Sequence, residues 1–207
     1  MSADGRQRFV IYDLAWPSYV GMIEALGRHR LRHVYHETTL ELTTRRLREN
    51  RIAKIIERIV GTLSLEVDRS IMTAGSATIL APEASCGIEP DTSFYISSEP
   101  KVRPDADAPR RKVPPPDLVI EVDPYTDCLI SRLDAFAKLG VREVWRCDGR
   151  ENVEFFRLYR RKRYRQVSAS EELPMTAAAI GKAVHNMNTL SENRLVRQVV
   201  TELTQSL

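Results

Sequence analysis

Three acidic side chains stand where strand-forming segments begin or end. Asp91 follows Pro90 at the turn into the segment TSFYI, and Glu121 and Asp123 lie two residues apart in LVIEVD. Residues two apart share one face of a strand, so these two acids share one face while Leu118, Ile120 and Val122 take the other. Because an unpaired carboxylate in such an apolar strand costs several kcal/mol, each of these acids needs a partner.

A divalent cation is one such partner. Mg²⁺ takes carboxylate and carbonyl oxygens as ligands and keeps several waters for a substrate. Asp91, Glu121 and the backbone carbonyl of Val122 would supply this set from adjacent strands, and Mn²⁺ would accept the same oxygens. The other interpretation is an arginine ion pair at the edge of the sheet.

Arg132, on the helix expected after LVIEVD, is a candidate protein cation for pairing with these acids. It lies three residues after Leu129 and four before Phe136, so it borders the apolar stripe of the expected helix that follows LVIEVD. From there it could reach back to the strand end, where a fixed positive charge would bind a phosphate or stabilise developing negative charge. Equally, it could do no more than neutralise Glu121 or Asp123.

Hydrophobic patterns predict the elements that position these residues. Residues 98–116, rich in proline, predict a long surface loop. The near-continuous apolar run LVIEV predicts a central strand covered on both sides. The other expected elements are a helix ending at Gly27, strands in LRHVYHE and TLELT, a helix from about Arg46, strands in RSIMT and SATIL, a helix over about 127–140, the strand VREVWRC, a hairpin of VEFFRLYR with RYRQV, and helices after about Ala177. This order predicts an α/β fold with a mixed central sheet flanked by helices.

Length and composition bound the function. The 207 residues, 43% of them hydrophobic, suit one domain over 1–207, with a core of about 16–175 and a helical tail of about 176–207.

A net charge of +3 excludes a strongly basic protein that coats nucleic acid. No run reaches the roughly 18 apolar residues of a membrane span, and the first residues lack a secretory signal, so we expect a cytoplasmic protein. Three scattered cysteines favour neither disulfides nor zinc. Without a P-loop, a dinucleotide-binding glycine motif or a GxSxG elbow, no organic cofactor is expected.

The runs EPDTSFYI, PPPDLVIEVD and RLDAFAKLGVREVWR occur in the order and spacing of the Uma2 family of restriction-endonuclease-like proteins. The chain resembles that family over about residues 16–175. Uma2 belongs to the PD-(D/E)xK nuclease superfamily, so the resemblance implies a restriction-endonuclease-like core with additional N-terminal strands and a C-terminal helix. It also implies hydrolysis of DNA phosphodiester bonds with Mg²⁺ or Mn²⁺, and a homodimer.

The resemblance also implies roles for individual residues. Asp91 corresponds to the aspartate of the PD motif, and Glu121 to the acid that follows it. Arg132 stands at the helix position to which the superfamily's lysine has moved in many members. Arginine cannot act as a general base, so here it would bind phosphate or orient a water. Asp123 would add a contact to metal or water.

The start of the long helix departs from the family pattern. The segment TTRRLREN places Glu49 and Asn50 where similar members carry a His-Glu pair. Glu49 lines up with the buried face of the helix and would replace the family's helix-borne acid, unless the site has eroded. Arg45, Arg46 and Arg48 crowd the same helix start and are candidate phosphate contacts or solvated surface charges.

A second basic cluster lies at the turn of the expected C-terminal hairpin. Tyrosines flank it, which would suit contact with a nucleic-acid backbone and some stacking on bases. The alternative is an exposed turn whose charges are simply solvated. The cluster consists of Arg160, Arg161, Lys162 and Arg163.

These observations favour a metal-dependent endonuclease that acts on DNA. A catalytically degenerate nuclease fold that binds nucleic acid or a protein is the alternative, and the arginine at the lysine position favours it. A metal-dependent hydrolase of another phosphodiester, such as RNA, is a third interpretation.

Overall fold

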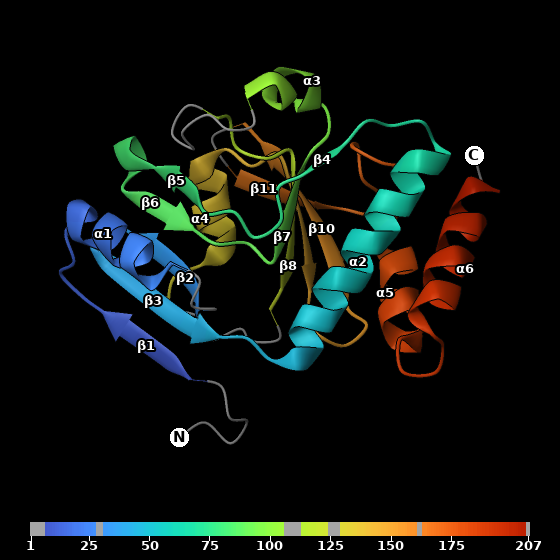
Figure 1. Cartoon of the computed structure of the whole chain (residues 1–207), viewed down its shortest axis with the longest axis horizontal. Coiled ribbons are helices and arrows are strands. Elements are labelled where there is room, and N and C mark those ends of the chain that lie inside the picture. The colour runs from blue at the N-terminus through green and yellow to red at the C-terminus, as the bar shows by residue number, and fades with distance from the viewer. Residues whose placement is uncertain (1–6, 28–30, 106–112, 124–128, 161–162, 206–207) are drawn as a thin grey trace.

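The strands of the protein form two sheets in a computed structural model that describes residues 7–27, 31–105, 113–123, 129–160 and 163–205 (Figure 1). The first sheet has the order β1-β3-β2-β6-β5, and every neighbouring pair in it is antiparallel. Its strands are β1 (Arg8–Ile11), β2 (Leu31–His36), β3 (Thr39–Thr44), β5 (Ile79–Ala81) and β6 (Cys86–Ile88).

The second sheet has the order β11-β10-β9-β8-β7-β4 and is mixed. Its one parallel pair is β8 with β9, and the other pairs are antiparallel. The strands are β4 (Met72–Thr73), β7 (Thr92–Tyr95), β8 (Leu118–Val122), β9 (Glu143–Cys147), β10 (Val153–Tyr159) and β11 (Arg163–Val167). The predicted α/β class with a mixed, nuclease-like sheet is confirmed.

Helices cover the sheets on both sides and lie between them (Figure 1). The helix α1 packs on the outer face of the first sheet. The helix α4 lies between the sheets, and α2, α5 and α6 share the core on the far face of the second sheet. Their bounds are α1 (Trp16–Leu26), α2 (Leu47–Glu66), α4 (Arg132–Leu139), α5 (Ala177–Asn186) and α6 (Glu192–Thr204). No helix among the described residues is long and apolar enough to cross a membrane.

The strand β8 is the centre of the second sheet, and all five of its residues are buried. Leu118, Ile120 and Val122 belong to the core formed with α2, α5 and α6. Val119 belongs to the core around α4, so Glu121, two residues later, faces the same layer between the sheets. The prediction of a strand covered on both sides is confirmed, and it places an acid in the interior.

The helix α4 is shorter than the predicted span of about 127–140. It begins at Arg132 because the Ser131 side chain accepts a hydrogen bond from the Asp134 backbone N–H at 3.2 Å and caps the helix. It ends at Gly140, which adopts a left-handed conformation with φ of 82°. Residues 127 and 128 lie outside the described part.

The predicted loop over 98–116 was partly wrong, because a short helix, α3 (Glu99–Val102), occupies part of it. Pro100 stands in its first turn, where a missing N–H costs nothing, so proline there does not exclude a helix. The strands β1 and β6 were not predicted either. They have only four and three residues, and their pairing with β3 and β2 depends on residues distant in the chain.

Candidate functional site

Asp91 and Glu121 meet at the end of β8. Because β7 runs antiparallel to β8 with Thr92 opposite Ile120, Asp91 lies beside the last residues of β8. The Val122 backbone N–H donates a hydrogen bond to Asp91 Oδ2 at 2.7 Å. Both carboxylates are buried, with Asp91 7% and Glu121 2% exposed. The sheet register therefore brings the two acids together.

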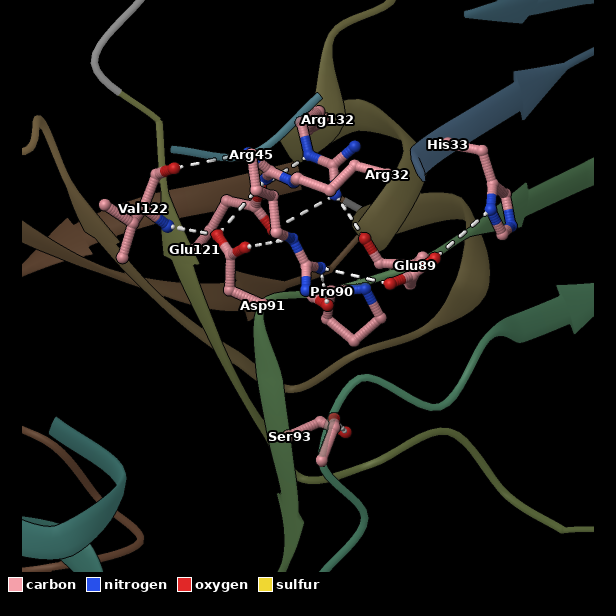
Figure 2. A network of polar contacts seen from close by, with 11 residues as sticks. Arg32, His33, Arg45, Glu89, Pro90, Asp91, Ser93, Glu121, Val122 and Arg132 are labelled. Carbon is pink, nitrogen blue, oxygen red and sulfur yellow. Dashed lines mark hydrogen bonds and ion pairs between the residues drawn. The ribbon is translucent and has the colours of Figure 1, made fainter. Parts of the chain in front are cut away.

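An arginine from the first sheet completes this cluster. Arg32 lies on the same face of β2 as Val34, whose side chain packs in the core around α4. Its guanidinium is fully buried and extends between the sheets toward β8 (Figure 2). Nη1 donates to the Val122 carbonyl at 3.3 Å, and Nη2 pairs with Asp91 Oδ2 at 3.3 Å and with Glu121 Oε1. One guanidinium thus contacts all three of the oxygen ligands that the sequence suggested for a metal.

A second arginine, Arg132, reaches Glu121 from the start of α4. Its Nε donates to Glu121 Oε1 at 2.6 Å, and its Nη2 lies 3.3 Å from Glu121 Oε2. The same Nη2 donates to the backbone carbonyl of Glu89 at 2.5 Å. These bonds fix both oxygens of the Glu121 carboxylate, so Arg132 acts directly on the orientation of that acid.

Arg45, between β3 and α2, closes the other side of the cluster (Figure 2). Its Nη2 donates to Glu89 Oε1 at 3.1 Å and to the Pro90 carbonyl at 2.9 Å, and its Nε pairs with Asp91 Oδ1 at 3.1 Å. His33 Nδ1 lies 3.5 Å from Glu89 Oε2. Glu89 therefore joins Arg45 to the histidine.

Among the described residues, the ion pairs of this cluster match three acids to three arginines. Three carboxylates face three guanidinium groups, namely Asp91, Glu121 and Glu89 with Arg32, Arg45 and Arg132. Burial, together with the nearby positive charge of Arg132, lowers the pKa of Arg32 to about 10. Arg32 remains protonated at neutral pH, because that pKa still lies well above 7.

A cavity of about 810 Å³ opens beside the cluster. Asp91, Glu89, Arg45 and His33 line one part of it, so acidic and basic groups of the site face the cavity. Its other walls come from apolar residues of α1, including Val20 and Ile23, and from polar residues of α2 and of the segment before β5. The cavity gives a polar ligand a route to Asp91.

The other two predicted acids, Glu49 and Asp123, form none of the ion pairs described above. Glu49 is 3% exposed, and its Oε2 accepts the Arg46 backbone N–H at 3.1 Å, which caps the start of α2. Its Oε1 is buried without a hydrogen-bond partner among the described residues. Asp123 follows β8, and its charge raises the pKa of Arg32, so it lies near the cluster.

The predicted nucleic-acid contacts lie in two places. Arg45 is in the cluster, whereas Arg48 is exposed at the start of α2 and donates to the Gly149 carbonyl at 2.9 Å. Arg160 and Arg163 are exposed at the β10–β11 turn. Arg161 and Lys162 lie outside the described residues.

The β10–β11 turn lies at the opposite end of the second sheet from the cluster. Tyr159 of β10 pairs with Arg163, and Arg157 pairs with Glu143, which lies opposite Leu118 at the beginning of β8. Glu121, in contrast, is near the end of β8. The turn therefore does not contribute to the cluster, and its contact with nucleic acid stays a prediction.

Sequence reasoning missed Arg32, His33 and Glu89. Arg32 lies in an alternating strand where an arginine normally faces solvent, and only the packing of the second sheet over that face buries it. The available signal is chemical: two buried acids at 91 and 121 need cations, and the helix pattern supplies only one of them, Arg132.

The oxygens of this site fit a divalent cation in kind. Two carboxylates and a carbonyl converge from adjacent strands, as Mg²⁺ prefers. Within the described residues no group of three or more His, Cys, Asp or Glu side chains could hold a metal, so the carbonyl and water would complete the ligand set. The Arg32 guanidinium occupies the position between these three oxygens. The oxygens would therefore bind a cation only after that guanidinium had moved away.

Comparison with protein-family models matches residues 20–183 to Uma2, which is described as a putative restriction endonuclease. The match spans most of the chain and contains the whole cluster around Asp91 and Glu121. A search of curated proteins finds no match.

Proposed function

Because the chain belongs to the Uma2 family, we propose that it is an endonuclease that hydrolyses DNA phosphodiester bonds with Mg²⁺ or Mn²⁺. The observation that supports this most is the convergence of Asp91, Glu121 and the Val122 carbonyl beside an open cavity. These oxygens would hold the cation, which supplies Lewis-acid stabilisation of the negative charge that develops on the phosphate.

The arginines of the cluster have distinct tasks in this proposal. Arg132 holds both oxygens of Glu121 and so fixes the direction in which that carboxylate points. The Val122 N–H does the same for Asp91. Arg45 lines the cavity and brings positive charge to the place where a phosphate would enter. Asp123 and Glu49 are further proposed contributors, through their position near Arg32 and at the start of α2.

Nicking of supercoiled plasmid tests this function. The wild-type protein should nick with Mg²⁺ or Mn²⁺ and stop with a chelator, and Asp91→Asn should lose nicking. Asp117→Asn is the control, because Asp117 is another buried aspartate, at the other end of β8, where it accepts hydrogen bonds from the Ser98 backbone and side chain. Both variants need far-UV circular dichroism to show that they fold. Equal nicking by wild type and Asp91→Asn would refute the proposed site.

A non-catalytic DNA-binding protein is the second candidate. Its support is the charge balance of the cluster, in which three guanidinium groups already neutralise the three acids. This candidate predicts DNA binding that weakens steeply with salt, without nicking under any divalent ion. A protein partner in place of DNA would show neither salt-dependent DNA binding nor nicking.

Two further expectations remain predictions. A homodimer would let two sites address two strands, and light scattering of the full chain measures the molecular mass that decides it. The predicted cytoplasmic location requires fractionation of cells that produce the protein.

A further inference from the structure

We propose that the guanidinium of Arg32 is a built-in competitor for the divalent cation, which can bind to Asp91, Glu121 and the Val122 carbonyl only by displacing it. This inference rests on the proposed function in that it takes these oxygens as the ligands of the cation. It adds a residue from the opposite sheet that sets how tightly the cation binds.

The contacts of Arg32 carry this inference. Nη1 reaches the Val122 carbonyl, and Nη2 lies against both Asp91 Oδ2 and Glu121 Oε1 (Figure 2). A magnesium ion would need to lie about 2.1 Å from the same oxygens. The ion and the guanidinium cannot both occupy that volume, and their like charges would repel strongly in a buried site.

The rest of the cluster allows Arg32 to leave. When its guanidinium withdraws, Arg45 still pairs with Asp91, and Arg132 still pairs with Glu121. Neither acid is left without a cation, so the cost of withdrawal is smaller than for an isolated buried pair. The Nε of Arg32 is buried and has no hydrogen-bond partner among the described residues, so the bound position of this side chain is incompletely satisfied.

Competition has a direct consequence for affinity. The free energy needed to move Arg32 is subtracted from the intrinsic free energy of cation binding, as for any ligand whose binding-competent state is a minor one. Removing the guanidinium should therefore tighten cation binding, although it also deletes the positive charge that pairs with Asp91 and Glu121 in the metal-free protein. A purely structural arginine predicts the reverse, because its loss would disorder the ligands.

Isothermal titration of Mn²⁺ into the full chain tests the inference. Arg32→Met keeps the length of the side chain and removes its charge, and it should bind Mn²⁺ at least about tenfold more tightly than wild type, equivalent to about 1.4 kcal/mol. Arg142→Met is the matched control, because Arg142 pairs with the buried carboxylates of Asp117 and Glu172 at the other end of the sheet. It should bind as wild type does. Equal or weaker binding by folded Arg32→Met would overturn the inference.

A second measurement uses the wild type and does not depend on the variant folding. The Arg32 side chain is fully buried, so an arginine-specific dicarbonyl reagent should leave it unmodified in metal-free protein. With saturating Mn²⁺, peptide mass mapping should show modification of Arg32, because displacement exposes it. Mn²⁺ binding at Asp91 and Glu121 while Arg32 stays unreactive would also overturn the inference.

The outcomes separate this inference from the proposed function. Tighter Mn²⁺ binding by Arg32→Met supports the competition whether or not the protein nicks DNA. Nicking by a wild type whose Mn²⁺ affinity is unchanged by Arg32→Met supports the nuclease and refutes the competition. Absence of measurable Mn²⁺ binding in both wild type and Arg32→Met refutes the competition, and it removes the metal-dependent nuclease as well.

Discussion

Replacing Glu121 with glutamine should lower the free energy of unfolding. A decrease is expected only if Arg32 and Arg132 neutralise Glu121 in the folded protein. Glu121 pairs with two buried guanidinium groups, since Arg32 is fully buried and the Arg132 side chain is 9% exposed. Removing one partner of a buried ion pair costs about 3–5 kcal/mol because it leaves charge uncompensated. Asp91 and the Glu89 carbonyl still hold the two arginines, so we expect the lower end, about 3 kcal/mol.

Urea unfolding followed by circular dichroism measures this change. At about 2–4 °C per kcal/mol for a domain of this size, the melting temperature should also fall by roughly 6–12 °C. Glu154→Gln is the control, because Glu154 pairs with Arg146, whose side chain is 39% exposed. Exposed pairs are worth about 0–1 kcal/mol, so this variant should remain close to wild type.

The opposite result would refute the reasoning. Two carboxylates that repel each other in a site without a cation would make the wild type strained, and neutralising one of them would then stabilise the fold. A Glu121→Gln variant as stable as wild type, or more stable, would mean that Arg32 and Arg132 do not neutralise Glu121 in solution. The contacts on which the competition between Arg32 and a metal depends would then be absent.

Three further predictions concern packing, pH and DNA binding. In Gly87→Ala the new Cβ would lie 2.8 Å from Cε1 of the buried Tyr19 ring, which should cost about 1–3 kcal/mol in urea unfolding, whereas nothing lies near the Cβ of the control Gly61→Ala. Burial raises the pKa of Glu143, so the native state binds its proton more tightly than the unfolded state does. The stability of wild type relative to Glu143→Gln should therefore fall as pH rises above the ordinary carboxyl pKa of 4.5, measured by urea unfolding, and a constant difference would contradict the shift. If the β10–β11 turn contacts DNA, Arg160→Ala should reduce the slope of log affinity against log salt by about one; an unchanged slope would indicate a solvated turn.

The sequence by itself predicted most elements because their signals are local. The isoleucine stripe of α2 follows the helical period, and the apolar run of β8 has no polar face until Glu121. Asp91 and Glu121 could be identified for the same reason, because a carboxylate within or beside a short apolar run is visible from the neighbouring residues alone. Short strands such as β6, and the helix α3 in a proline-rich segment, carry no such local signal.

The sequence also determined that Asp91 and Glu121 need a cation, and the family motifs indicated a metal. The sequence placed Arg132 within reach of Glu121, but only the tertiary structure decided that Arg32 also lies against both acids. Arg32 lies 59 and 89 positions before the two acids in the printed sequence, and it meets them because the first sheet packs face to face with α4 and the second sheet. The pleat of β2 turns Arg32 inward and His33 toward α1. No periodicity in a strand can reveal which element will cover its face, because that depends on packing between residues far apart in the chain.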